Sequence, residues 1–314
     1  MRKFLTKLAV FLLIGAALYV AAMAILGSMP LEHNKVVVRG NDGHLLSRYR
    51  EAQTYGDVDV LFVGSSHCYR TFDTRYYAEK GLRTFNLGSS NQTPIQTLAL
   101  LRLCLDSLNP RYVVFEVHPD VFSNQGVESS VDLLSNCPLS KPLTRMAFAT
   151  PSLRTFNALT YAALDKFVLH RYASASEDSI IRGNAYVSGG FVERDADAFQ
   201  PAKLAKRDIE IYGKQTDNLR ECLALLQQRG ISCCLVEVPS SQALRNAYAN
   251  HSAFEESMEA NGLYFNGNAY PELTSLLVDS IHFADEDHLN QQGVAVFNEF
   301  FYNTILSPWM SQQK

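Results

Sequence analysis

The pattern of hydrophobic and polar positions divides the chain into an apolar N-terminal stretch and a long region of alternating short apolar and amphipathic runs. The apolar stretch, residues 8–27, contains no charged side chain and is long enough to cross about 30 Å of hydrocarbon as a helix. Arg2, Lys3 and Lys7 precede it, and positive charge on that side favours a cytoplasmic N-terminus. We therefore predict a single-pass membrane anchor, with the rest of the chain outside the cytoplasm.

A cleaved signal peptide is the competing interpretation of this segment, since Ala22 and Ala24 provide a small-x-small cleavage pattern. The charge-free run exceeds the roughly 7–15 residues of a signal-peptide core, which favours the anchor. Under either interpretation the domain that follows is exported. Residues 28–56 are polar and predict a juxtamembrane connection to a domain that spans residues 57–314.

Beyond the connection, the alternation of the two kinds of run predicts the fold class. The short apolar runs predict buried strands at residues 58–63, 82–87, 112–117 and 231–238. The amphipathic runs predict helices at residues 73–80, 94–108, 204–228 and 291–306. Strands that alternate with helices indicate an α/β fold with a mainly parallel sheet and helices on both faces. Ligands of such sheets bind at the carboxyl ends of the strands.

Residues 121–203 do not follow the alternation and are predicted to be an insertion. Within it, residues 157–171 have a helical pattern, and residues 186–192 predict a hairpin or an exposed loop around Gly189 and Gly190. Long connections in compact domains are often functional. The insertion therefore either covers the strand ends or is a structural excursion without substrate contact.

Composition narrows the class of protein. The chain has 314 residues, of which 47% are hydrophobic and 19% charged, a profile typical of a globular protein. The net charge of −4 and the absence of a dense basic run outside the N-terminus argue against nucleic acid as a partner. Six cysteines show neither a disulfide framework nor zinc-ribbon spacing, so we expect buried free thiols. Cys233 and Cys234 are adjacent in a predicted strand and should point to opposite faces.

The first candidate for chemistry is Ser66. It lies in Gly64-Ser65-Ser66-His67, which directly follows a predicted strand, on a turn where glycine lets the backbone bend. A strand end of this kind is a suitable place for a nucleophile. A plain polar turn is the alternative, because Gly-Ser-Ser sequences are common in loops.

A second candidate pair, Asp285 and His288, precedes the last predicted helix. Residues three apart lie on one side of a helical turn, so Asp285 is placed to orient His288. A serine hydroxyl needs a base, and the base needs a partner that fixes its tautomer and stabilises its charged form. Ser66, His288 and Asp285 fit these three roles, although an Asp-x-x-His spacing is common by chance.

The segment at residues 86–92 completes a recognisable order. It again follows a short strand, and Gly88 there supplies a backbone N–H that can face a developing oxyanion. With this segment the chain resembles the SGNH (GDSL-like) hydrolase superfamily over residues 57–120 and 204–306. The resemblance implies a flavodoxin-like three-layer αβα fold. It also implies that Ser66 rather than Ser65 is the nucleophile, that Gly88 and the Ser66 N–H bind the oxyanion, and that Asp285 and His288 complete the triad.

One block of the superfamily pattern is missing. After the third strand the family has Gly-x-Asn-Asp, whose Asn donates to the oxyanion, whereas residues 115–120 of this chain contain no Asn. Asn91 or Gln92 is a possible substitute, with a turn or helix-capping role as the alternative. The resemblance therefore leaves the third oxyanion donor open.

The resemblance is strongest to membrane-anchored members that act on cell-surface polymers, such as alginate-type O-acetyltransferases and the D-alanyl-transfer protein of teichoic acid synthesis. It implies a serine esterase or O-acyltransferase, acetyl being the expected acyl group, that acts on a surface glycan or cell-wall polymer. A membrane partner that supplies acyl groups is compatible with the anchor. The alternative is a non-catalytic assembly or binding protein of a polymer-export system.

A metal site is the remaining possibility at the strand ends. The candidate ligands His67, Glu116, His118, Asp120 and His282 match no zinc or calcium spacing. A metal-dependent phosphodiesterase is accordingly the more distant alternative. We expect no metal and no other cofactor.

Overall fold

A five-stranded parallel sheet forms the centre of the structure, a computed structural model that describes residues 1–29, 36–195, 199 and 203–313. The strand order is β2-β1-β3-β7-β8, which is the flavodoxin-like order when these strands are counted along the chain. Their bounds are Val60–Gly64 (β1), Thr84–Gly88 (β2), Tyr112–Glu116 (β3), Ser232–Glu237 (β7) and Tyr264–Asn266 (β8). The mainly parallel α/β sheet and four of its strands are as predicted.

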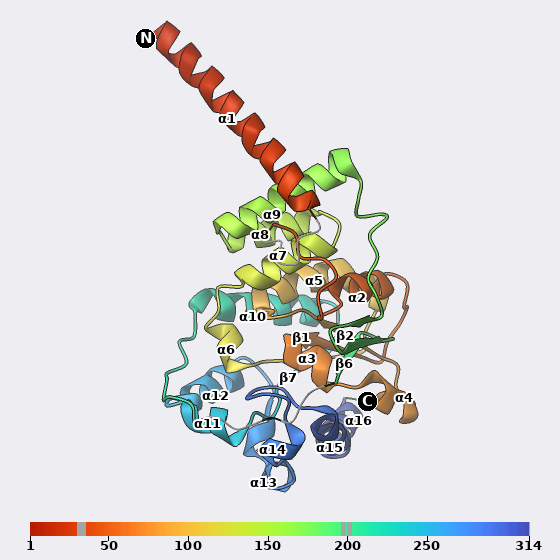
Figure 1. Ribbon diagram of the computed structural model, residues 1–314. Coiled ribbons are helices and arrows are strands. Elements are labelled where there is room, and N and C mark those ends of the chain that lie inside the picture. The colour runs from red at the N-terminus through yellow and green to blue at the C-terminus, as the bar shows by residue number, and fades with distance from the viewer. Residues whose placement is uncertain (30–35, 196–198, 200–202, 314) are drawn as a thin grey trace.

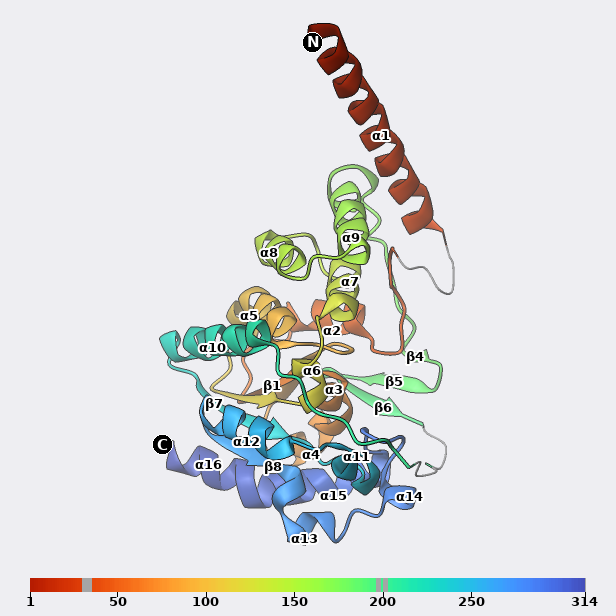
Figure 2. The same cartoon turned by 90° about the vertical axis from the view of Figure 1, so that its left-hand side faces the viewer.

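Alternate residues of each strand enter two separate cores, one on each face of the sheet. Leu61 and Val63 of β1 belong to one core, and Val60 and Phe62 belong to the other. Helices cover both faces, so the three-layer αβα prediction is confirmed (Figure 2). The first face carries α2 (Leu45–Ala52), α5 (Pro94–Leu108) and α10 (Gly213–Gln228). The second carries α3 (Ser66–Thr71), α4 (Thr74–Glu79), α15 (Gln291–Phe301) and α16 (Ser307–Gln312).

The cysteines follow the same division. Cys233 packs on the first core and Cys234 lies in the second, as their adjacent places in β7 predicted. All six thiols are free, and five of them are buried. Burial raises the pKa of each buried thiol, so these cysteines are structural side chains that stay protonated.

The helix predicted at residues 204–228 is wrong in its first part, because α10 begins only at Gly213. The preceding segment is extended, and it pairs through a bridge between Arg207 and Tyr248. The backbone N–H of Arg207 donates to the Ala247 carbonyl at 2.8 Å, and the Asn250 side chain accepts from the Ile209 N–H at 2.7 Å. These long-range partners satisfy the backbone and replace the hydrogen bonds that a helix would supply.

The region predicted as an insertion contains helices on one side and a small sheet on the other. Its helices are α6 (Pro119–Phe122), α7 (Val127–Asn136), α8 (Lys141–Ala149), α9 (Leu153–Leu164) and the π-helix η1 (Asp165–Leu169). An antiparallel sheet follows, with β4 (Ile180–Ile181), β5 (Asn184–Val187) and β6 (Phe191–Arg194). The predicted hairpin is confirmed, since β5 pairs with β6 across Gly189 and Gly190.

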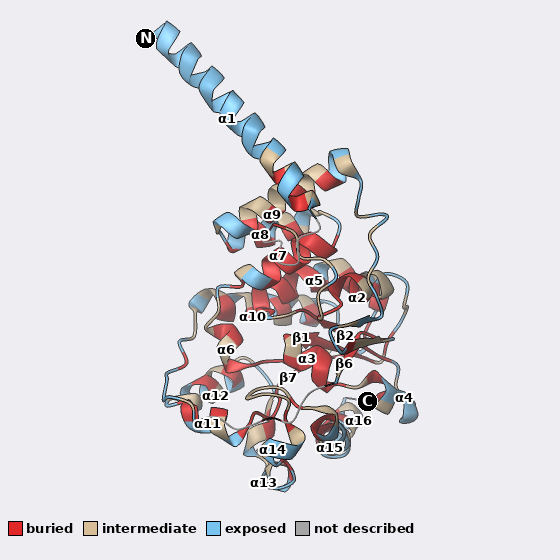
Figure 3. Ribbon diagram, viewed as in Figure 1, coloured by how far each residue is buried: buried red, intermediate tan, exposed pale blue. Residues whose placement is uncertain are grey.

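The N-terminal helix α1 (Arg2–Ser28) projects from the domain beside α9 (Figure 1). Its side chains are exposed over almost the whole length, and only its last turns contact the domain (Figure 3). It is long and apolar enough to cross a membrane, a test that a signal sequence also passes. Within the predicted connection, α2 is folded and buries Leu45, Leu46, Arg48 and Tyr49 against the domain.

Candidate active site

The turn between β1 and α3 sets Ser66 at the first position of a helix. Gly64 has a φ angle of 152°, and a Cβ atom there would collide with the Glu116 carboxylate, so the turn requires glycine. Ser65 caps α3 by accepting the His67 N–H at 3.2 Å, and its hydroxyl donates to Glu116 at 2.9 Å. The Ser65 hydroxyl is therefore committed to the turn, while Ser66 faces the next element of the site.

His288 and Asp285 lie in the loop between α14 (Asp279–His282) and α15. A bridge between Phe283 and Leu289 closes this loop, and the Ala284 N–H donates to the His288 carbonyl at 2.8 Å. His288 Nε2 lies 2.8 Å from Ser66 Oγ, and Nδ1 lies 2.9 Å from Asp285 Oδ1. The loop thus joins the three predicted residues into one hydrogen-bonded chain.

A second carboxylate, from Asp287, shares the imidazole. Its Oδ1 atom lies 2.8 Å from His288 Nδ1, as close as that of Asp285. The two differ in what else holds them. Asp285 Oδ1 also accepts the backbone N–H of His288 at 2.8 Å, and its Oδ2 pairs with Arg194 of β6 at 2.7 Å. Asp287 reaches instead to His67 Nε2 at 3.4 Å.

These carboxylates control the charge of His288. Burial of the imidazole disfavours its charged form, but the hydrogen bonds and negative charges of Asp285 and Asp287 outweigh burial and raise the pKa of His288 to about 9. Burial likewise opposes ionisation of Asp285, yet the hydrogen bond from His288 lowers the pKa of this carboxyl below its usual range. The resting site therefore favours an imidazolium paired with carboxylates.

Three histidines from three segments form a stack beside Ser66. The His67 ring lies parallel to that of His118, with centroids 4.1 Å apart, and parallel to that of His288, with centroids 4.5 Å apart. His118 Nδ1 accepts the Asp120 N–H at 3.3 Å. Burial, together with the charge of His67, holds the pKa of His118 well below its ordinary value, so this ring stays neutral. The stack supports the imidazole plane of His288 from one side.

His67, Asp287 and His288 have their nitrogen and oxygen atoms within 4.8 Å of one another, a spacing that invites a metal ion. The ring geometry argues against one. A nitrogen lone pair lies in the plane of its ring, and the planes of His67 and His288 are parallel within 4° and stacked. Two stacked rings cannot both direct a lone pair at the same ion. The stacking therefore does not favour a shared metal ion at these described residues.

The structure separates the remaining metal candidates. Glu116 is buried beneath the Ser65 turn, where it accepts the Ser65 N–H at 2.7 Å and occupies the block that lacks the family Asn. Asp120 pairs with Arg207 at 2.5 Å. His282 accepts the Val278 N–H at 2.9 Å. None of the three contacts described here involves Ser66 or His288.

The two other predicted site residues have different positions. Gly88 ends β2 in register with Gly64, and a Cβ on Gly88 would lie 2.9 Å from the carbonyl of Ser65. Gly88 is thus next to the turn that carries Ser66. Asn91 is exposed, and its amide donates to Glu128 at 2.8 Å, so the structure does not join it to Ser66. The Gln92 amide is buried and donates to Thr97 at 2.9 Å.

A pocket of about 500 Å³ opens next to the triad. Asp287 contributes to its wall, together with Leu244 and Glu286. Arg207, Asp120, Leu204 and Ala205 complete the lining. The mixture of charged and aliphatic side chains suits a polar ligand with some apolar surface.

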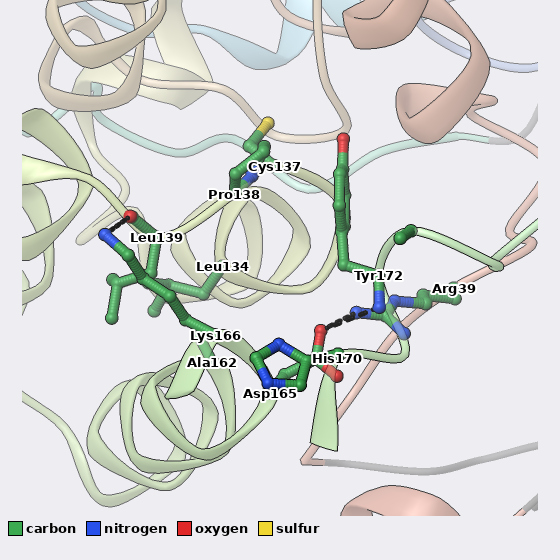
Figure 4. A pocket seen from close by; sticks show the side chains of 11 residues that line it. Arg39, Leu134, Cys137, Pro138, Leu139, Ala162, Asp165, Lys166, His170 and Tyr172 are labelled. Carbon is green, nitrogen blue, oxygen red and sulfur yellow. Dashed lines mark hydrogen bonds and ion pairs between the residues drawn. The ribbon is translucent and has the colours of Figure 1, made fainter. Parts of the chain in front are cut away.

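A second pocket, of about 290 Å³, lies far from these residues, among α7, α9 and residues 170–173 (Figure 4). Its charged groups already have partners. Arg39 pairs with Asp165 at 3.2 Å, and Lys166 Nζ donates to the Leu139 carbonyl at 2.9 Å. The described groups around this pocket include no counterpart of the serine, base and acid chain.

The sequence analysis named neither Asp287 nor Arg194, and it considered His67 only as a candidate metal ligand. Asp287 had a usable signal, since it stands directly before His288. His67 also had one, because it follows the nucleophile. Arg194 had none, because its contact with Asp285 joins residues 91 positions apart.

Comparison with known proteins yields similarity in fold only. No protein-family profile matches the chain, and no curated protein matches its sequence. Among solved structures, a GDSL-like lipase from Bacteroides thetaiotaomicron VPI-5482 has 12% identity and a TM-score of 0.38, covering 85% of this chain and 100% of its own. A Bacteroides fragilis NCTC 9343 protein, provisionally described as an acylhydrolase, has 12% identity and a TM-score of 0.41, covering 86% and 98%. These are remote likenesses of chain arrangement, and the chemistry of this chain follows from its own residues.

Proposed function

We propose that this chain is a serine-dependent esterase or O-acyltransferase of the SGNH (GDSL-like) type. The observation that carries the proposal is the hydrogen-bonded chain from Ser66 Oγ through His288 to Asp285. A nucleophile, a base and an orienting acid in this order are the elements of acyl transfer. Ser66 lies at the carboxyl end of β1, which is where α/β sheets bind ligands, and the loop before α15 brings His288 and Asp285 to it.

In the proposed reaction, Ser66 Oγ attacks the carbonyl carbon of an ester and its proton passes to His288 Nε2. The imidazolium then donates this proton to the departing alkoxide, which leaves an acyl group on Ser66. Water or a sugar hydroxyl next attacks the acyl-serine while His288 accepts its proton. The bond between the acyl carbon and Ser66 Oγ then breaks, and the imidazolium returns the proton to Ser66 Oγ, which restores the resting residues and releases the acid or the acylated sugar. Asp285 holds the Nδ1–H tautomer and stabilises the imidazolium in both halves of the reaction.

Two backbone N–H groups are proposed to stabilise the oxyanion. The Ser66 N–H makes no hydrogen bond within the described part of the chain, so it is available to a substrate oxygen. Gly88 lies on the other side of the turn and supplies the second donor. Asn91 remains a prediction for the third donor, and it would have to release Glu128 to act.

The proposed substrate is an O-acylated, preferably O-acetylated, polysaccharide or cell-wall polymer at the cell surface. The pocket beside Asp287, with its charged and aliphatic side chains, and the N-terminal helix support this class of substrate. The helix is proposed to be a retained single-pass anchor with a cytoplasmic N-terminus, because its last turns pack against α9 at Tyr161. A membrane partner that hands acyl groups to Ser66 fits a transferase, and water as acceptor gives an esterase.

A fluorophosphonate probe tests the assignment of the nucleophile. We expect it to label wild type at residue 66 and to leave Ser66→Ala unlabelled, with peptide mass spectrometry as the readout. Ser65→Ala is the matched control. It removes a buried donor to Glu116 and costs about 1–3 kcal/mol of stability, but it keeps the label. An unlabelled wild type would instead favour the non-catalytic assembly protein.

The pH dependence follows from the charge of His288. Only the neutral imidazole accepts the Ser66 proton, and its pKa is raised to about 9. We therefore expect kcat/KM for p-nitrophenyl acetate to increase as the pH is raised from neutral, and to reach a plateau once the pH exceeds the His288 pKa of about 9. Ser66→Ala provides the background rate at each pH. A profile that is flat between pH 7 and the value of about 9 would contradict a base with this pKa.

A further inference from the structure

The C-terminal part of α1, from Tyr19 to Gly27, packs along one side against α9. Tyr19 Oη donates to Asn157 at 2.8 Å, and Met23 is buried in a cluster with Tyr161. Any side chain at Gly27 would collide with the Tyr161 ring, so the two helices are in direct contact there. The contact from Tyr19 to Gly27 covers about 12 Å along the helix axis. The position of α1 therefore fixes that of α9.

This contact places α9 at the level of a membrane surface if α1 crosses the bilayer, a condition that belongs to the proposed function. The charge-free run of residues 8–27 just fills a hydrocarbon core of about 30 Å. Tyr19 lies within this run, about 12 Å before its end at Gly27. Asn157 of α9, which accepts the hydrogen bond from Tyr19, then lies in the headgroup zone or closer to the centre of the bilayer.

The side chains around α9 suit that environment. Among the described residues that follow α1, the most exposed large apolar side chains are Leu153, Phe167, Val168, Ile180 and Phe148, with exposed fractions of 75%, 70%, 65%, 65% and 64%. Four of these five lie at the end of α8, the start of α9 or in η1, and we call these four the α8–η1 face. Exposed apolar groups gathered in this way mark an interaction site.

The charge of the same segment differs in sign from that of the chain. Residues 138–176 contain five lysines and arginines and a single carboxylate, whereas the whole chain carries −4. That carboxylate, Asp165, is buried and paired with Arg39 at 3.2 Å. Basic side chains next to exposed phenylalanine and leucine are typical of protein surfaces that lie in the interface of anionic membranes.

We propose that the α8–η1 face, formed by Phe148, Leu153, Phe167 and Val168, inserts into the headgroup zone of an anionic bilayer beside α1. The bilayer is favoured over a protein partner because α1 emerges from the same group of helices. Together, α1 and the α8–η1 face would attach the domain to the bilayer at two places and so fix its orientation. The loop with Asp285 and His288 lies between α14 and α15, at the end of the domain opposite α1 (Figures 1 and 2). The site then faces away from the bilayer, toward substrates outside it.

Tryptophan fluorescence tests the inference on the full chain in vesicles of phosphatidylcholine and phosphatidylglycerol with brominated acyl chains. Trp309, the only tryptophan of the sequence, is 5% exposed, so wild type supplies the baseline. We expect Phe148→Trp and Phe167→Trp to lose most of the added emission. Leu276→Trp, at a site near α14 that is 57% exposed, should keep its emission. All three substitutions place an apolar side chain where one is already exposed.

Flotation of the same samples separates this inference from the anchor. Variants that float with the vesicles but show equal emission at Phe148→Trp, Phe167→Trp and Leu276→Trp would overturn the α8–η1 face while the anchor stands. A chain that does not float would overturn both. Equal quenching in vesicles of phosphatidylcholine alone would overturn the role of anionic lipid. If the two tryptophans were shielded from a water-soluble quencher such as iodide but not quenched by the brominated lipid, a second copy of the chain would cover the α8–η1 face instead.

Discussion

His288→Ala is expected to lower kcat/KM for p-nitrophenyl acetate by about 10³-fold or more. Among the described residues, His288 is the one side chain that hydrogen-bonds to Ser66 Oγ, at 2.8 Å. Without it the hydroxyl keeps its proton and remains a weak nucleophile. Ser66→Ala should lose a similar factor, and the double variant should be no slower than either single one, because the two residues act as one unit.

His282→Ala is the matched control for this measurement. His282 precedes the same loop, is half-buried and makes its hydrogen bond to the Val278 backbone. Its loss should leave the rate within about twofold of wild type, since it contacts neither Ser66 nor His288. If His288→Ala retained most of the activity and bound the fluorophosphonate as wild type does, the proposed esterase or acyltransferase would be wrong.

The parts of the site that depend on short stretches of sequence were predictable. A buried run followed by Gly64-Ser65-Ser66 places a serine at a strand end, and four residues contain both Asp285 and His288. The resemblance already favoured Ser66 over Ser65, and the structure adds a physical reason, because Ser65 is tied to Glu116 by two hydrogen bonds. Local order thus indicated the chain of proton transfer before the fold was known.

The parts that depend on distant segments were not predictable. The histidine stack brings His118 from the end of β3 against His67 and His288, and no spacing in one sequence encodes such a contact. Arg194 reaches Asp285 from the hairpin of the predicted insertion. That contact places part of the insertion at the site. The sequence had left open whether residues 121–203 cover the strand ends or are a structural excursion.

The distinction between local and distant contacts also explains the errors in the predicted fold. The alternation of apolar runs gave the right strand sequence for β1, β2, β3 and β7, whose central residues are all buried. It missed β8, which has three residues and lies at the edge of the sheet, too short for a periodicity. The segment before α10 places Ile209 and Ile211 against the first core and is held extended by partners near residues 247–250.

Asp285→Asn is expected to lower kcat/KM by about 10⁴-fold, whereas Asp287→Asn should lower it by about tenfold at most. Asp285 is fixed between the His288 imidazole and Arg194, at 2.9 Å and 2.7 Å. An asparagine amide in its place either opposes the Arg194 guanidinium or donates to Nδ1 and stabilises the wrong tautomer. Asp287 lacks such a clamp, and its other contact, with His67, is longer at 3.4 Å.

The two variants also differ in their pH profiles, which makes the comparison decisive. Asp287 is one of the two carboxylates that raise the pKa of His288, so its loss should move the rise of kcat/KM to lower pH while the plateau remains. Circular dichroism controls for folding in both variants. If Asp287→Asn were instead the more damaging change, Asp287 would be the orienting acid. The Asp-x-x-His assignment would then be wrong, although the roles of Ser66 and His288 would stand.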